Sequence, residues 1–343
     1  MDIISLNYTA LRPKTAEKIK NYLALSCNNR LTIGLYKKGR FYVFGDPGEE
    51  NQLLYDIGSV SKTLTAHLIL KLCGDGKLDI HNTVDRYLPL KSGKYPTIYQ
   101  LLTHTAGYRH LTPAEVTVPQ LLRHGYARKN PYETCTVKTV IKCLERRRFW
   151  KPKVRYGYSD FAPAILAATA EAVTKRPFSV LFAEFIQQEL GLTNTILEAD
   201  PQSRGPLAAQ GKKILPFWVW HRDNPYIAGG GMTSNIEDLL RYIALQIESD
   251  APYITDAHIV CRESARNNDN HLMCIGWHTY KQSNQLWHVG GVGTFRTSVI
   301  LNRHRRLGVA VLGNAKGKTS ANAHYIAKML YSELKNKRIR LPH

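Results

Sequence analysis

Short β-strand patterns occur at the two ends of this chain, and helical patterns fill most of the middle. Near the N-terminus, apolar runs at residues 31–36 and 41–44 flank the turn Lys37-Lys38-Gly39-Arg40, which predicts a β-hairpin. Four further short strands with hairpin-like breaks are predicted near the C-terminus, at residues 274–280, 285–289, 297–302 and 308–313. This arrangement indicates one sheet built from both ends of the chain, with a helical region inserted between them.

The predicted helices define what lies between the two groups of strands. A short helix is predicted at residues 15–25, and an apolar helix begins at Gly58-Ser59 and ends at Gly74-Asp75-Gly76. Further helical patterns occur at residues 98–102, 118–122, 137–144, 162–173, 178–190 and 236–247, and an amphipathic helix closes the chain at 321–334.

From this order of elements we predict two domains, one of them discontinuous. Residues 1–75 and 271–343 would form an α/β domain whose mainly antiparallel sheet is flanked by the terminal helices. Residues 76–270 would form an inserted all-α domain. A crevice between the two domains is the expected place for an active site.

The composition is that of a folded globular protein. The 343 residues suffice for about two domains of roughly 150 residues, and 43% are hydrophobic, which excludes a disordered or collagen-like chain. No stretch approaches the roughly 18 consecutive apolar residues of a membrane helix, and residues 1–6 lack the features of a signal peptide. We therefore expect no membrane span and a cytoplasmic location, or a secreted one if a leader precedes this sequence.

The cysteines point to neither a disulfide scaffold nor a metal site. The six cysteines are scattered and form no C-x-x-C pair, so they show no zinc-binding spacing. Buried free thiols in a reducing compartment are the expected outcome. We predict that the protein uses no metal and no cofactor.

The chain carries a formal net charge of +20, which raises the question of an anionic partner. The basic residues are dispersed, and the densest run, residues 146–155, is not accompanied by a finger, an RNP-type aromatic motif or a basic zipper pattern. We therefore predict no specific nucleic-acid binding. Because this run directly precedes Tyr158, its positive potential is expected to favour an anionic small-molecule substrate.

Ser59 and Lys62 provide a local arrangement suited to nucleophilic catalysis. Residues three apart on a helix share one face, so the lysine nitrogen can lie within hydrogen-bonding reach of the serine hydroxyl. A serine hydroxyl becomes a nucleophile only when a neighbouring group takes its proton. The helix N-terminus can in addition present backbone N–H groups to a developing oxyanion.

A serine three residues before a lysine is weak evidence alone, because Ser332 and Lys335 repeat this spacing with no chemistry around them. The context of Ser59 distinguishes it. The segment Asp56-Ile57-Gly58 precedes it, and Tyr158-Ser159-Asp160 and His288-Val289-Gly290-Gly291 follow in order along the chain.

With these motifs the sequence resembles the serine penicillin-recognising hydrolases, most closely the branch with class C β-lactamases, D-aminopeptidases and family VIII esterases. The resemblance covers nearly the whole chain. It is carried by six segments in the family's order: YDIGSVSKTLTAHLI, DGKLDIHNTVDRYLP, LLTHTAGY, KPKVRYGYSD, AGGGMTSNIEDLLRY and WHVGGVGTF. The resemblance implies a β-lactamase/transpeptidase-like fold, with an antiparallel sheet flanked by helices and an inserted helical domain.

The resemblance also implies catalytic roles for three residues. Ser59 matches the acylated nucleophile, and Lys62 matches the lysine that deprotonates it or holds its proton. Tyr158 matches the tyrosine that, with this lysine, shuttles the proton to the leaving group and activates water for deacylation.

Four further residues are implied in substrate and oxyanion binding. His288 stands where many relatives have the lysine of a K-T-G strand motif. Gly290 and Gly291 would keep room for substrate along the strand edge, and the N–H of Gly291 with that of Ser59 would form the oxyanion hole. Asp160 departs from the family's usual Asn or Ser, and an ionised carboxylate cannot donate to a substrate amide carbonyl, although it could pair with Lys62.

Two other enzyme classes do not fit the sequence. The segment Gly313-Asn314-Ala315-Lys316-Gly317-Lys318-Thr319 has three residues between its glycines where a P-loop has four, and it lies almost at the C-terminus. No serine has glycine two positions before and two after it, so the nucleophile elbow of α/β-hydrolases is absent. Residues 101–107 and Gly229-Gly230-Gly231 are interpreted as structural, the first as a helix end and the second as a site of tight packing.

The predicted function is a serine hydrolase that forms an acyl-enzyme on Ser59 and hydrolyses small ester or amide substrates, including D-amino-acid peptides. Two alternatives remain open. One is β-lactamase or D-Ala-D-Ala carboxypeptidase activity. The other is a non-enzymatic role, either as a slowly acylated sensor or as a polyanion-binding protein with a vestigial site.

Overall fold

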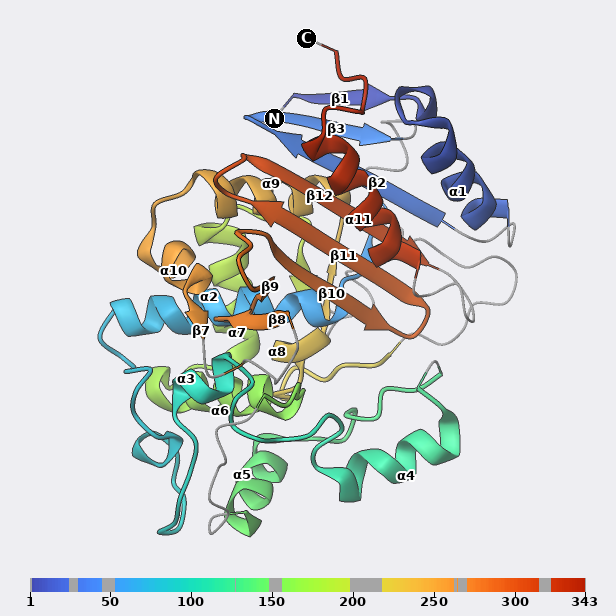
Figure 1. The fold of residues 1–343 in the computed structure, drawn as a ribbon. Coiled ribbons are helices and arrows are strands. Elements are labelled where there is room, and N and C mark those ends of the chain that lie inside the picture. The colour runs from blue at the N-terminus through green and yellow to red at the C-terminus, as the bar shows by residue number, and fades with distance from the viewer. Residues whose placement is uncertain are drawn as a thin grey trace.

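The computed structural model describes residues 2–24, 30–44, 53–126, 128–147, 156–197, 218–261, 264, 270–314 and 322–342. Its central feature is a nine-stranded sheet with the strand order β1-β3-β2-β12-β11-β10-β9-β8-β7 (Figure 1). β1 is parallel to β3 and every other neighbouring pair is antiparallel, so the sheet is mixed. The strands are β1 (Ile3–Leu6), β2 (Arg30–Lys37), β3 (Arg40–Phe44), β7 (Val260–Cys261), β8 (His271–Cys274), β9 (His278–Tyr280), β10 (Leu286–Val292), β11 (Phe295–Asn302) and β12 (Leu307–Asn314).

Helices cover both faces of this sheet (Figure 1). α1 (Pro13–Ala24) and α11 (Asn322–Lys335) pack on one face, where their apolar residues form a core with the strands. α9 (Ile236–Glu248) packs on the other face. All eight residues of β12 are buried, because this central strand has a helix on each side of it.

The middle of the chain forms a helical part next to the sheet. α2 (Ser61–Gly74) and α6 (Phe161–Thr174) lie at its centre, and most of their side chains, polar ones of α2 included, are buried. The remaining elements are α3 (Ile98–Leu102), α4 (Ala114–His124), α5 (Val137–Arg146), α7 (Phe178–Glu184), α8 (Ile227–Gly230), α10 (Pro252–Thr255) and a small sheet in the order β4 (Tyr55–Asp56), β6 (Met232–Ser234), β5 (Ile196–Leu197).

The observed elements follow the predicted order, and the strands differ from it in two ways. The predicted strand at residues 274–280 is two strands, β8 and β9, because Gly276 turns the chain between them with a φ of 77°. β1 and the very short strands β4 to β7 carry too few residues for a recognisable period and were not predicted. The predicted architecture, a sheet flanked by helices with a helical region inserted between its strands, is confirmed.

The division into residues 1–75 with 271–343 and 76–270 stays a prediction. Two elements of the predicted insertion belong with the sheet, since β7 is its last strand and α9 covers one face. A single hydrophobic core also extends from the sheet into the helical part, joining residues such as Val299 of β11 with Ile165 of α6.

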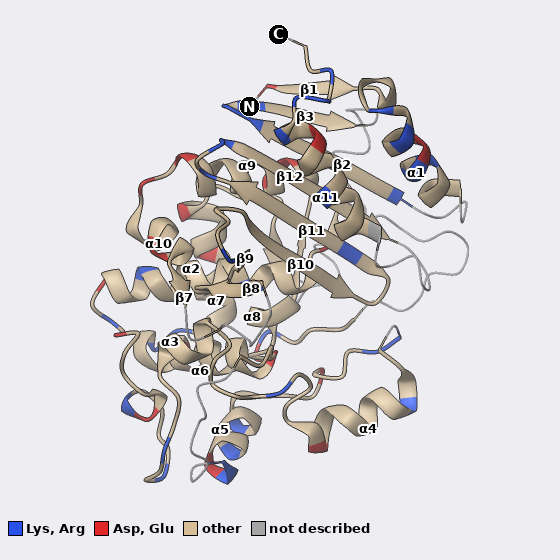
Figure 2. Ribbon diagram, viewed as in Figure 1, with Lys and Arg blue, Asp and Glu red and all other residues tan. Residues whose placement is uncertain are grey.

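The surface features agree with a dispersed positive charge. Lys and Arg positions are scattered over helices, strands and loops (Figure 2). Of the run at residues 146–155, Arg146 forms a 2.7 Å ion pair with Glu115 and Arg147 donates to Cys143, while residues 148–155 lie outside the described residues. Within the described part of the chain, no helix is both long and apolar enough to cross a bilayer.

Candidate active site

Ser59 lies on a tight turn between β4 and α2. Residues Gly58–Val60 form a 3₁₀ turn, and Ser61 begins α2 by donating its hydroxyl to Gly58 O at 2.7 Å. The turn packs directly on the backbone of β10. A Cβ placed on Gly290 would overlap Ile57 O and lie 3.1 Å from Ser59 N, so only glycine permits this contact.

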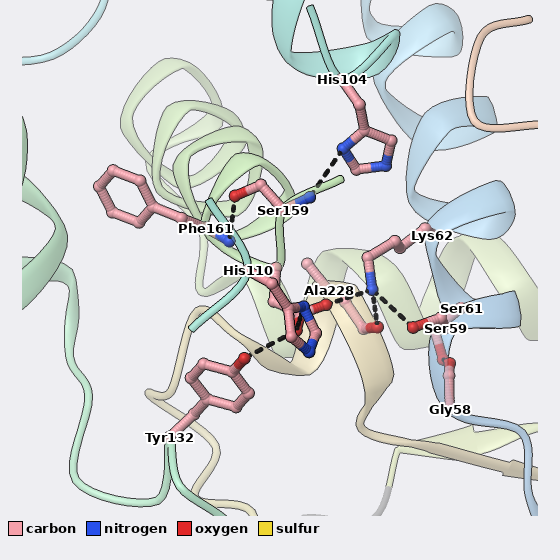
Figure 3. Close-up of polar contacts among 12 residues, drawn as sticks. Gly58, Ser59, Ser61, Lys62, His104, His110, Tyr132, Ser159, Phe161 and Ala228 are labelled. Carbon is pink, nitrogen blue, oxygen red and sulfur yellow. Dashed lines mark hydrogen bonds and ion pairs between the residues drawn. The ribbon is translucent and has the colours of Figure 1, made fainter. Parts of the chain in front are cut away.

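Lys62 lies one helical turn after Ser59 and uses all three of its N–H bonds (Figure 3). It donates to Ser59 Oγ at 2.8 Å, to Gly229 O at 2.7 Å and to Asp160 Oδ1 at 2.7 Å. An ammonium has three donors and no acceptor. In this arrangement Lys62 therefore holds Ser59 in place as a fully satisfied cation.

Asp160 is the counter-ion of Lys62 and lies at the N-terminus of α6. Its other oxygen, Oδ2, accepts hydrogen bonds from Tyr132 OH at 2.7 Å and from His110 Nδ1 at 2.9 Å. The carboxylate is buried, whereas the His110 ring is about half exposed, with 48% of its side-chain surface accessible. Asp160 thus links the buried lysine to an imidazole at the surface.

The protonation states follow from burial and from this ion pair. Burial acts to lower the pKa of Lys62, but the Asp160 carboxylate and Tyr158 act more strongly together, and its pKa is raised above the ordinary lysine value. Burial acts to raise the pKa of Asp160, yet Lys62 and His110 hold it well below the usual carboxyl range. The pair is therefore ionised throughout the neutral range.

Tyr158 lies between Lys62 and a group of imidazoles. The Lys62 nitrogen is 5.1 Å from the centre of its ring, and the rings of His104, His278 and His288 lie 4.7, 6.1 and 6.4 Å from it. Burial raises the pKa of the Tyr158 phenol, whereas the positive charge of Lys62 and hydrogen bonding with Ser59 lower it. The phenol is protonated at neutral pH and lies next to both Ser59 and Lys62.

His288 lies on the same face of β10 as Gly290, close to Tyr158, but is buried and does not line the large cavity. Its ring is fully buried, and its Nδ1 donates to Val289 O at 2.9 Å, which leaves Nε2 unprotonated and without a hydrogen-bond partner among the described residues. Burial lowers its pKa to about 3. The side chain does not line the large cavity described next, so its placement gives it no direct contact there.

A cavity of about 940 Å³ opens beside Ser59. It runs along the edge of β10, where Gly290 and Gly291 pair with β11 on one side only. Much of its lining is aromatic or imidazole. The lining residues are Ser59, His110, Tyr126, Tyr156, Tyr158, His271, His278, Trp287, Val289, Gly290, Gly291, Arg296, Thr297, Ala323 and His324.

The structure therefore brings Ser59, Lys62, Tyr158 and Asp160 together, with Gly290 and Gly291 along the cavity edge. It does not bring the His288 side chain into the cavity. Within the described residues, no group of three or more His, Cys, Asp or Glu side chains is arranged to hold a metal ion.

Four residues of the site were not predicted from the sequence. Tyr132 and His110 reach Asp160 from separate loops and carry no local motif. Gly229 contributes only a backbone carbonyl, and the sequence suggested packing for it. Arg296 could have been found from the hairpin register, because it lies directly opposite Gly291 in the β10–β11 pair.

The fold and the serine–lysine pair at the start of a buried helix define a class, the β-lactamase/transpeptidase-like proteins. The similar solved structures include an octameric penicillin-binding protein homologue from Pyrococcus abyssi, with a TM-score of 0.74 and 22% identity, covering 94% of this chain and 77% of that one. A β-lactamase/D-alanine carboxypeptidase from Yersinia pestis has a TM-score of 0.72 and 18% identity, covering 94% and 98%.

The sequence comparisons then give the family. The β-lactamase family model matches residues 33–331, and this chain belongs to that family. A β-lactamase from Providencia stuartii is 28% identical over 64% of this chain and 55% of its own length. Protein flp from Staphylococcus aureus is 23% identical over 80% of this chain and 54% of its own length. The chain thus spans about half the length of these curated relatives.

Proposed function

We propose that this protein is a serine hydrolase that forms an acyl-enzyme on Ser59 and hydrolyses small ester or amide substrates. The observation that carries the proposal is the 2.8 Å hydrogen bond from Lys62 to Ser59 at the mouth of the cavity. Membership of the β-lactamase family supports serine hydrolase chemistry in general. The position of Gly291 supports an oxyanion hole, because a Cβ on Gly58 would lie 2.6 Å from Gly291 N, beside the turn that holds Ser59 N.

In the acylation step, Ser59 Oγ attacks the substrate carbonyl carbon and the bond to the leaving group breaks. The Ser59 proton passes to the Tyr158 oxygen as the phenol gives its own proton to the leaving group. The N–H groups of Ser59 and Gly291 hold the oxyanion. Lys62 stays an ammonium and stabilises the negative charge that develops on Ser59 Oγ and on the Tyr158 oxygen.

Deacylation reverses these transfers with water in place of the leaving group. Water attacks the acyl carbonyl and gives a proton to Tyr158, which returns one to Ser59 Oγ as the ester bond breaks. The acid product leaves and the resting hydrogen bonds re-form. No charge is created on Asp160 or Lys62, since their ion pair remains intact throughout.

Two features favour ester and simple amide substrates over β-lactams. Asp160 is engaged by Lys62, Tyr132 and His110 and has no N–H to offer a substrate carbonyl. The residue in the place of the strand-motif lysine, His288, is buried and neutral rather than a cation in the cavity.

The proposal is tested with p-nitrophenyl esters, a chromogenic β-lactam and D-Ala-containing peptides, assayed by turnover and by intact mass of the acylated protein. The Ser59→Ala variant is expected to lose turnover and covalent labelling. Ser332→Ala is a matched control, because Ser332 has the same spacing to Lys335 on exposed positions of α11. Undiminished activity of Ser59→Ala would refute the proposal, and stoichiometric release without turnover would indicate a sensor.

A further inference from the structure

The cavity beside Ser59 continues past the edge of β10 onto the other face of the sheet. Side chains alternate along a strand, and those of Trp287, Val289 and Arg296 lie on the face covered by α11. Ala323 and His324 of α11 line the cavity from that side. We refer to Trp287, Arg296, Ala323 and His324 together as the outer chamber.

Arg296 lies at the end of the outer chamber nearest to Ser59. It is directly opposite Gly291 in the β10–β11 register, and a Cβ placed on Gly291 would lie 3.4 Å from Arg296 Nη1. The guanidinium therefore lies against the strand residue whose N–H is proposed to hold the oxyanion. A substrate bound at Ser59 reaches it by crossing the strand edge.

The guanidinium of Arg296 is held in place but is only partly used. Its Nη1 donates to Gly293 O at 2.9 Å and to Phe295 O at 2.6 Å, both in the β10–β11 turn region. No carboxylate of the described residues forms an ion pair with it. Arginine has five N–H donors, and neither Nε nor Nη2 forms a hydrogen bond with the described residues, so these two groups remain for a ligand. A partly buried cation without an acidic partner is costly and is commonly matched by a bound anion.

The rest of the outer chamber suits a planar or apolar group. The Trp287 ring stacks on His278 with centroids 4.4 Å apart and lies 5.1 Å from the ring of His324. Burial lowers the pKa of His324 to about 4, so it adds no positive charge at neutral pH. The Lys62 charge is already balanced by Asp160. Among the residues that line the cavity there is one arginine, Arg296, and no lysine.

We propose that Arg296 is the anion-recognition residue of this site, and that the preferred substrates are esters or amides carrying a carboxylate on the part that enters the outer chamber. The planar fork of a guanidinium fits a carboxylate through two parallel hydrogen bonds. This proposal rests on the proposed function for the ester or amide bond. It assigns the selectivity for anions to Arg296 rather than to residues 146–155, of which Arg146 is paired with Glu115 and residues 148–155 lie outside the described residues.

The first test compares esters that differ only in charge. Mono-p-nitrophenyl succinate, glutarate and adipate are matched with the p-nitrophenyl esters of butanoic, pentanoic and hexanoic acid, and kcat/KM is measured for each pair. We expect the native protein to prefer at least one anionic ester, and Arg296→Gln to reduce the anionic-to-neutral ratio by about 10-fold to 100-fold. Arg296→Lys keeps the charge but lacks the planar guanidinium. Its anionic-to-neutral ratio is expected to lie between those of the native protein and Arg296→Gln.

Arg305→Gln is the matched control, because Arg305 is an exposed arginine in the turn at the other end of β11 and its loss changes the net charge equally. Its anionic-to-neutral ratio is expected to equal that of the native protein. The ratio is taken within one preparation, so a partly unfolded variant does not distort it. An unchanged ratio in Arg296→Gln, or an equal fall in Arg305→Gln, would overturn the proposal.

The second test separates this proposal from the proposed function. Binding of 5-phenylpentanoate and of 5-phenylpentanamide to Ser59→Ala is followed by tryptophan fluorescence, with and without Arg296→Gln. We expect the acid to bind at least 10-fold more tightly than the amide only when Arg296 is present. If the native protein does not turn over any ester while this preference holds, the proposed function fails and the anion site stands. Equal binding of acid and amide to Ser59→Ala overturns the anion site.

Discussion

The ion pair between Lys62 and Asp160 makes Asp160→Asn the most informative single substitution. The two charged atoms lie 2.7 Å apart with side chains 3% and 10% exposed. At an effective dielectric constant of about 20, their attraction is on the order of 6 kcal/mol. The asparagine keeps an oxygen for Lys62 but removes the charge, so burial then lowers the pKa of Lys62 without opposition from a carboxylate.

The expected result follows from the role of Lys62 as a cation. In the native protein the raised pKa keeps Lys62 charged, so kcat is expected to be flat between about pH 6.5 and 9 with respect to this group. In Asp160→Asn, kcat is expected to fall as pH rises through the lowered pKa. Breaking a buried ion pair costs about 3 kcal/mol or more, which corresponds to a roughly hundred-fold loss of kcat at pH 8.

The assay is the pH profile of kcat for a neutral p-nitrophenyl ester, with thermal unfolding as a check on folding. Tyr132→Phe serves as the control, because it removes one hydrogen bond to Asp160 Oδ2 and leaves the Lys62 contact in place. Its effect is expected to be about 1 kcal/mol with no change in the shape of the profile. If Asp160→Asn is as active as the native protein at pH 8 or more so, Lys62 acts as a neutral base and the mechanism proposed above is wrong.

Two further predictions concern the scaffold of the site. Gly290→Ala is expected to reduce kcat/KM by more than 100-fold, because its Cβ would overlap Ile57 O and separate β10 from the Ser59 turn. Gly74→Ala is the control, since nothing lies within 4 Å of the new Cβ there. An equal effect of the two substitutions on ester turnover would contradict this reasoning. Burial lowers the pKa of His67 to about 4 and that of His104 to about 3, so the unfolded chain takes up protons that the folded protein excludes as pH falls from about 6.5. Each histidine is then expected to reduce the free energy of unfolding by up to about 1.4 kcal/mol per pH unit down to its folded-state pKa, and a urea midpoint that does not fall between pH 7 and 5.5 would refute this.

The sequence predicted the architecture well because most elements are long enough to show a period. Residues 31–36 and 308–313 read as strands from their apolar runs, and both are central strands of the sheet. The two-residue strand β7 and the position of α9 on the sheet could not be predicted. They depend on packing between segments that are far apart in the sequence, which a local pattern does not record.

The candidate site was predicted where its residues stand in the motifs that carry the family resemblance. The contact of Ser59 with Lys62 follows from helix geometry, and the sequence also allowed Asp160 to pair with Lys62. The contacts of Asp160 with Tyr132 and His110 join segments up to 50 residues away, and only the folded chain brings them together. The complete burial of His288 depends on the rings of His278 and Tyr158 packed around it, which come from other segments of the chain.

Lys62 and Asp160 balance each other's charge at the candidate site, inside a chain of net charge +20. Mobile ions screen charges over about 8 Å at physiological ionic strength, but they do not enter a buried contact of 2.7 Å. The chemistry proposed at Ser59 is therefore expected to depend little on the ionic strength of the solution. The excess positive charge on the rest of the chain is instead expected to raise the rate at which anionic molecules associate with the protein.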